Sequence, residues 1–279
     1  ELAYGKLHPK TQLSARIATP MIGLGLLEAI PAAAIKAQAD PDDQNRDGIS
    51  GRVNHVIDLA TGKRAIGRFG WKAGQASVRA QNVAAFAGDL GITSQELPLE
   101  SCTETQKACR QAPSGGDPEL TTAVLDAVTF YASNLAVPAQ RQGQSEAVQT
   151  GQQLFTSTGC ASCHTPSWTT GEKPATAAWL ANQTIYPYTD LLVHDMGEDL
   201  ADHRPEGEAN GREWRTPPLW GIGLTQTINP GSHFLHDGRA RTLAEAILWH
   251  DGEAKASRQS FQKLAKSERD ALLAFLNSL

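Results

Sequence analysis

The sequence lacks the features of a membrane-spanning or nucleic-acid-binding protein. No apolar run is long enough to cross a bilayer, and the richest one, residues 21–35, is short and interrupted by Gly and Pro. The formal net charge of −5 provides no basic surface for nucleic acid. We therefore expect neither a membrane span nor a nucleic-acid partner.

The sequence also lacks a starting Met and an N-terminal signal peptide. We therefore expect a mature product or part of a longer chain. The 279 residues suit one large domain or two small ones, and an apolar content of 40% is sufficient for a hydrophobic core.

Cysteine is scarce, and the four Cys residues fall into two local pairs. Cys102 and Cys109 lie in a polar loop without a nearby histidine, so we expect them to form a disulfide. Two free surface thiols are the alternative. Because disulfides persist in oxidising compartments, this pair favours the periplasm.

The second pair belongs to the stretch TGCASCHTP, in which Cys160, Cys163 and His164 form a Cys-x-x-Cys-His motif. Two thiols about one helical turn apart can add to the two vinyl groups of a haem, and the adjacent histidine then ligates the iron. A thioredoxin-like dithiol would need a βαβ pattern, which is absent. A zinc site would need a second ligand pair, and none is convincing. We predict one covalently bound haem c.

The second axial ligand of this haem must come from downstream. His250 lies on the apolar face of a predicted helix that opens with Thr242 and Glu245 at capping-box spacing. This position suits an iron ligand in a dry pocket, although an ordinary core histidine is the alternative. Met196 is the rival ligand because a thioether also binds haem iron, and its alternative role is core packing. Second-rank candidates near the haem edge are His194, His233 and His236.

A candidate cation loop lies in residues 39–54. Asp43, Asn45 and Asp47, followed by a Gly, match the start of a calcium-binding loop, in which oxygen ligands at alternate positions surround one ion. The terminal Glu of that pattern is missing, and Asn54 stands in its place. We expect a calcium site, with a solvated Asx-rich turn as the alternative.

An internal repeat is the last feature of the residues themselves. Residues 15–31 and 213–230 share the order Arg, Thr-Pro, Gly-rich apolar run and Pro, and residues 68–81 loosely match 233–246. Chance similarity between Gly- and Pro-rich loops is the alternative. If the repeat is real, the haem motif of the first copy would lie upstream of Glu1, so we expect the first unit to be incomplete.

Several ordered motifs resemble the dihaem cytochrome c peroxidase and MauG superfamily, and more closely its dihaem oxidoreductase branch, often labelled thiol oxidoreductase. They include ADPDDQNRDGISGRVN (39–54), YTDLLVHDMG (188–197), WRTPPLWGIGLT (214–225) and FLHDGRARTLAEAILWH (234–250). The resemblance implies two cytochrome c-like units with one haem each. Because helical patterns dominate, we predict an all-α fold with long loops. Residues 1–116 would form the remainder of the first unit, and residues 117–279 a bridging helix and the second unit.

The resemblance also implies roles for single residues. Trp71 falls where the family has a tryptophan between the haems, as an electron relay, and Asp89 falls where peroxidases place an acidic residue beside the open haem. Core packing and a helix-end position are the respective alternatives. His250 falls at the position of the distal ligand of the second haem.

We therefore predict a periplasmic haem oxidoreductase that transfers electrons between a peroxide-type oxidant and a partner protein or substrate. A second haem is expected in the full-length protein. The alternative is an electron-transfer cytochrome, or a haem-binding module, with a closed six-coordinate haem and no enzymatic activity. A structural or metal-handling module is a third hypothesis.

Overall fold

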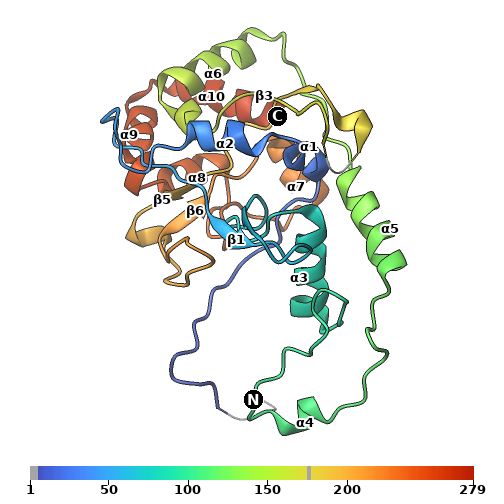
Figure 1. Ribbon diagram of the computed structural model, residues 1–279. Helices are drawn as coiled ribbons and strands as arrows, with labels where there is room; N and C mark the ends of the chain where they lie inside the picture. The colour runs from blue at the N-terminus through green and yellow to red at the C-terminus, as the bar shows by residue number, and fades with distance from the viewer. Residues whose placement is uncertain (1–5, 175–176) are drawn as a thin grey trace.

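The computed structural model describes residues 6–174 and 177–279 of the chain (Figure 1). Its α-helices are short and are spread along the whole sequence. They are α1 (Leu24–Glu28), α2 (Ala32–Gln38), α3 (Val78–Leu90), α4 (Lys107–Arg110), α5 (Thr122–Ser133), α6 (Glu146–Ser157), α7 (Thr225–Ile228), α8 (Leu243–Trp249), α9 (Lys255–Lys263) and α10 (Lys266–Ser278).

Short antiparallel strand pairs and 3₁₀ turns lie between the helices. The pairs are β1 (His55–Ile57) with β2 (Arg64–Ile66), β3 (Trp168–Thr169) with β4 (Thr184–Ile185), and β5 (Val193–Asp195) with β6 (Glu213–Arg215). The 3₁₀ turns are η1 (Cys160–Ser162), η2 (Ala178–Leu180), η3 (Glu198–Leu200), η4 (Ile222–Leu224) and η5 (Gly252–Ala254).

The expectation of an all-α fold is wrong. Only 37% of the structure is helical, 8% is strand, and loops make up much of the rest. The chain contains 25 Gly and 15 Pro residues, which disfavour the interior of helices because Gly loses more backbone entropy and Pro lacks the N–H donor. The named strands have two or three residues each, too few to show the alternation that identifies a strand in a sequence.

Helices α6 and α10 pack closely against each other and place the Cys-x-x-Cys-His turn (Figure 1). A Cβ atom on Gly151 of α6 would lie 2.0 Å from the carbonyl oxygen of Ala271 in α10, so only glycine permits this approach. The rings of Phe155 and Phe275 meet at 5.4 Å beside this contact. Because α6 ends at Ser157, the turn that follows lies directly beside this packed helix pair.

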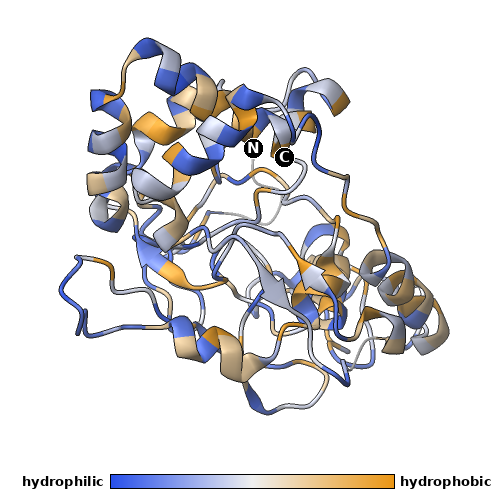
Figure 2. Ribbon diagram, turned by 90° about the horizontal axis from the view of Figure 1, so that it is seen from above, coloured by the Kyte–Doolittle hydropathy of each residue, from blue (hydrophilic) through white to orange (hydrophobic). Residues whose placement is uncertain are grey.

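A second core lies between α1, α2 and the strands. It contains large apolar side chains from distant parts of the chain, including Leu27, Ile30, Phe69, Leu192 and Trp220. Helix α3 packs on α5 in a smaller cluster. Hydrophobic and hydrophilic residues are interspersed along the helices in Figure 2, as expected for helices that bury one face only.

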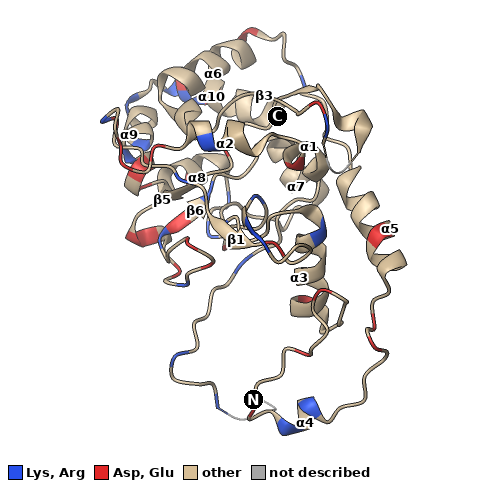
Figure 3. Ribbon diagram, viewed as in Figure 1, with Lys and Arg blue, Asp and Glu red and all other residues tan. Residues whose placement is uncertain are grey.

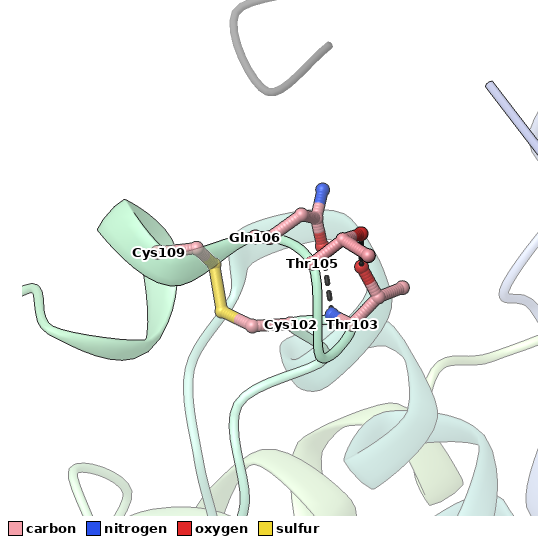
Figure 4. The surroundings of a disulfide bond; sticks show 5 residues. All are labelled: Cys102, Thr103, Thr105, Gln106 and Cys109. Carbon is pink, nitrogen blue, oxygen red and sulfur yellow. Dashed lines mark hydrogen bonds between the residues drawn. A yellow bond between two sulfur atoms is a disulfide. The ribbon is translucent and has the colours of Figure 1, made fainter. Parts of the chain in front are cut away.

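The predicted disulfide is confirmed, because Cys102 and Cys109 are bonded in the loop that contains α4 (Figure 4). The backbone N–H of Thr103 donates to Oε1 of Gln106 within this loop (2.8 Å). Helix α4, which Lys107 and Arg110 colour blue in Figure 3, lies far from α6 and α10.

In residues 6–174 and 177–279, no helix combines the length and the apolar character needed to cross a bilayer.

Candidate functional site

A cavity of about 860 Å³ lies beside the Cys-x-x-Cys-His turn, within the usual size range of cofactor sites. Its walls are mostly apolar and come from residues 17–22, from the turn after α6, from residues 214–225 and from helices α8 and α9. Parts of the chain far apart in sequence therefore enclose one space.

Cys160 and Cys163 both line this cavity as free thiols. Gly159 precedes them with a φ of 85°, a left-handed conformation that glycine adopts without strain, and it turns the chain from α6 into η1. Burial raises the pKa of the Cys160 thiol. The turn thus presents two thiols to the cavity at the spacing that thioether bonds to a haem require.

His164 also lines the cavity, and its ring is oriented as for a metal ligand. Nδ1 donates a hydrogen bond to the carbonyl oxygen of Tyr188 (2.9 Å), so Nε2 keeps its lone pair. Burial lowers the pKa of His164 to about 4, and the imidazole is neutral at pH 7. A neutral, oriented imidazole is the form that binds haem iron.

His250 and Met196 both reach the same cavity. His250 follows α8, and its Nδ1 donates to the carbonyl oxygen of Ala246 (2.8 Å), which again leaves the Nε2 lone pair available. Burial lowers the pKa of His250, and its nearness contributes to the lowered pKa of His164. The histidine therefore has the orientation of a ligand.

Trp71 also borders the cavity. Its Nε1 donates to the carbonyl oxygen of Ile17 (2.8 Å), and its ring meets that of His236 edge-on at 6.4 Å. His236 in turn stacks on Trp214 at 3.7 Å. Burial lowers the pKa of His236 to about 4. The second-rank histidines His194, His233 and His236 all line the cavity.

Asp89 is not among the residues around this cavity. It lies near the C-terminal end of α3 and is exposed. The structure therefore does not bring Asp89 together with Trp71, and its proposed acid–base role concerns a different place in the molecule.

The candidate cation loop forms a series of Asx turns. The carboxylate of Asp43 accepts from the backbone N–H of Gly48 (3.2 Å), and that of Asp47 accepts from Ile49 (2.9 Å). The side-chain oxygen of Asn45 accepts from the N–H of Asp47 (3.0 Å). Asn54 is buried, and its oxygen accepts from the backbone at 208 and 209, so it does not supply the missing ligand.

Sequence reasoning missed the carboxylates around His194. Its Nε2 bonds Asp190 (2.8 Å), and its Nδ1 bonds Glu253 (2.7 Å) and lies 3.7 Å from the sulfur of Cys163. Burial alone would lower the pKa of His194, but these hydrogen bonds raise it well above its ordinary value. Only the four-residue spacing of Asp190 and His194 could have indicated a pairing, because Glu253 comes from a distant turn.

The arrangement fits a haem bound through its vinyl groups. Two thiols and an oriented imidazole face a space of suitable size with mainly apolar walls, and a second imidazole, or a thioether, is available as the other axial ligand. Among the described residues, the one group of three ligand-type side chains close enough to share an ion is Cys163, Asp190 and His194. A metal ion there is therefore the alternative occupant of this turn.

Of the comparisons with known proteins, one identifies a family. The sequence matches a family described as "Di-haem oxidoreductase, putative peroxidase" over residues 5–279. No curated protein matches. Among solved structures, a hydrazine synthase of Kuenenia stuttgartiensis, pressurized with 20 bar xenon, is 17% identical, and the alignment covers 100% of this chain and 96% of that chain with a TM-score of 0.39. This similarity is too low to indicate a function.

Proposed function

Because the chain belongs to this di-haem oxidoreductase family, we propose that it holds one covalent haem c in the 860 Å³ cavity and acts in peroxidase-type electron transfer. Cys160 and Cys163 form the thioether bonds, and His164 is the proximal ligand. The observation that carries this proposal is that all three side chains of one turn face a single apolar cavity. The bound haem would supply one-electron oxidation and reduction.

We assign the second axial position to His250 rather than Met196. The hydrogen bond from Nδ1 to Ala246 fixes the ring, so Nε2 is ready to bind without reorganisation. Two imidazole ligands give a low-spin haem with a lower reduction potential than histidine with methionine. With both imidazoles bound, the haem would supply electron transfer and would keep no open position for peroxide.

The axial assignment is tested by the optical spectra of two variants. His250→Ala should convert the low-spin spectrum to a high-spin one, because the iron loses its second imidazole. Met196→Ala should leave the low-spin spectrum unchanged and serves as the matched control from the same cavity. A high-spin spectrum in Met196→Ala and a low-spin spectrum in His250→Ala would instead identify Met196 as the second axial ligand.

The remaining parts of the proposed function concern electron transfer beyond this haem. We propose that residues 1–116 belong to one cytochrome c-like unit and residues 117–279 to another. Trp71, at the wall of the cavity, relays electrons between the haem units, and Asp89 handles protons at the other haem. The partners are a small-molecule oxidant and a redox protein or substrate. The disulfide and the covalent haem support a periplasmic location.

Turnover distinguishes this enzyme from a simple electron carrier. With peroxide and a reduced dye, the full-length protein should oxidise the dye catalytically, and its second haem should contribute a high-spin component that changes on adding cyanide. A carrier should show a purely low-spin haem and reversible redox chemistry without turnover. An electron carrier is the second candidate function. Both His164 and His250 reach the cavity, and together they would occupy both axial positions of the iron.

We also propose that the loop of Asp43, Asn45 and Asp47 binds calcium. The loop already brings their side-chain oxygens into one turn through its own backbone hydrogen bonds. Calcium should raise the melting temperature of the wild type and should have no effect on Asp43→Asn/Asp47→Asn. Equal melting temperatures of the wild type with calcium and with a chelator would contradict calcium binding and would indicate an Asx-rich turn without an ion.

A further inference from the structure

Arg215 is a buried cation that faces the haem cavity. It is the last residue of β6, its side chain borders the cavity, and it is 5% exposed. Nε donates to the carbonyl oxygen of Gly70 (2.8 Å), and Nη1 donates to that of Thr216 (3.2 Å). In the part of the chain that the structure describes, no carboxylate lies within ion-pair distance of this guanidinium.

The charge of Arg215 is retained despite its burial. Burial lowers its pKa to about 10, which still leaves it protonated at neutral pH. The carboxylate whose charge acts on it is Asp190, but both oxygens of Asp190 are already engaged. One accepts from the backbone of Leu192 (2.9 Å), and the other bonds His194 (2.8 Å). A buried charge without a close counter-ion is costly, so the site favours an anion.

Two other arginines show what distinguishes Arg215. Arg258 also borders the cavity, but it has an ion pair with Asp251 at 3.2 Å. Arg68 is similarly buried, but it does not border the cavity, and its Nη1 donates to the carbonyl oxygens of Leu27 and Ile30 at the end of α1. The partial negative charge of a helix C-terminus compensates a cation there. Arg215 is on a strand and has no such helix end.

We propose that Arg215 binds a propionate carboxylate of the haem within the cavity, an inference that rests on the proposed covalent haem. A planar guanidinium can donate two parallel hydrogen bonds to one carboxylate, which suits a buried ion pair. Its position is held by the strand, because the N–H of Arg215 donates to the carbonyl oxygen of Trp71 (2.8 Å) and the residue lies opposite Val193 in the β5–β6 ladder. The pair would also fix the rotation of the haem relative to His164.

The consequence for redox chemistry follows from charge. A cation beside the haem favours the reduced iron, which carries one positive charge less than the oxidised iron. Removing Arg215 should therefore lower the midpoint potential of the haem without changing its axial ligands.

The test is the midpoint potential of the covalent haem at pH 7, measured by spectroelectrochemistry on the full chain. Arg215→Gln should have a lower potential than the wild type, with the same haem content and the same low-spin spectrum. Arg215→Lys, which keeps the charge but not the two parallel donors, should have an intermediate potential. Arg68→Gln is the matched control: it removes an equally buried arginine and should keep the wild-type potential.

The outcomes separate this inference from the proposed function. Wild-type potentials in haem-loaded Arg215→Gln and Arg215→Lys would overturn the assignment of Arg215 and leave the covalent haem intact. If Arg215→Gln does not fold, Arg215→Met, which also removes the charge, takes its place, and a wild-type potential in that variant overturns the assignment. An equal drop in Arg68→Gln would show a general effect of lost buried charge and would also overturn it. Absence of covalent haem from the wild type would contradict the proposed function and the inference together.

Discussion

The burial of His236 makes the stability of the protein depend on pH in a defined range. Its ring stacks on Trp214 and is 6% exposed, and burial lowers its pKa from 6.5 to about 4. Below pH 6.5 the unfolded chain takes up a proton on this histidine before the folded chain does. The stabilisation by the neutral ring is therefore full above pH 6.5 and is lost as the pH falls from 6.5 toward 4.

The magnitude follows from the two pKa values. Linkage between the folded state, with a pKa of about 4, and the unfolded state, with a pKa of 6.5, lowers the free energy of unfolding by about 0.2 kcal/mol at pH 7 and about 2 kcal/mol at pH 5, relative to its value at high pH. His236→Phe can still stack on Trp214 but does not titrate. Its free energy of unfolding should therefore fall less than that of the wild type between these pH values, by about 2 kcal/mol.

Urea unfolding at pH 7 and pH 5, followed by tryptophan fluorescence, measures this difference. Other titrating groups are common to both proteins and cancel in the comparison. His8→Phe, which removes an exposed histidine, should follow the wild type. Equal losses in the wild type and His236→Phe would refute the claim that the folded protein keeps His236 buried and neutral.

Two further predictions concern packing and buried charge. Gly151→Ala should lower the free energy of unfolding by about 3 kcal/mol, because its Cβ would lie 2.0 Å from a carbonyl oxygen of α10. Gly88→Ala in α3, where a Cβ meets nothing within 4 Å, should instead raise it by about 0.5 kcal/mol; destabilisation of similar size in both would contradict the argument. Lys72→Met removes a fully buried ammonium 2.7 Å from Asp202 and should cost about 2 kcal/mol in urea unfolding. Lys266→Met, which breaks an exposed ion pair, should cost less than about 0.5 kcal/mol, and equal costs would show that burial does not matter here.

The parts of the site that lie in one turn could be predicted from the sequence. The spacing of Cys160, Cys163 and His164 predicts haem attachment without tertiary information, and the structure places all three beside one cavity. The Cys102–Cys109 disulfide was accessible for the same reason, because its partners are close along the chain.

The parts of the site that depend on tertiary contacts could not be predicted. Arg215 and Glu253 have no local pattern that distinguishes them from surface charges, and only the fold places them beside the cavity. The short strands that carry Arg215 and His194 were missed because two or three residues show no periodicity. The predicted calcium loop matched the pattern at its first positions, but the buried role of Asn54 depends on contacts with residues about 150 positions away.

The most direct test of the central claim is the haem content and spin state of this chain, from a pyridine haemochrome assay with an optical spectrum. We predict one covalent haem per chain with a low-spin spectrum, from ligation by His164 and His250. A high-spin spectrum would contradict the two-histidine ligation. No covalent haem in a host that attaches haem c to other proteins would contradict the account, and bound zinc in its place would assign Cys163, Asp190 and His194 to a metal site.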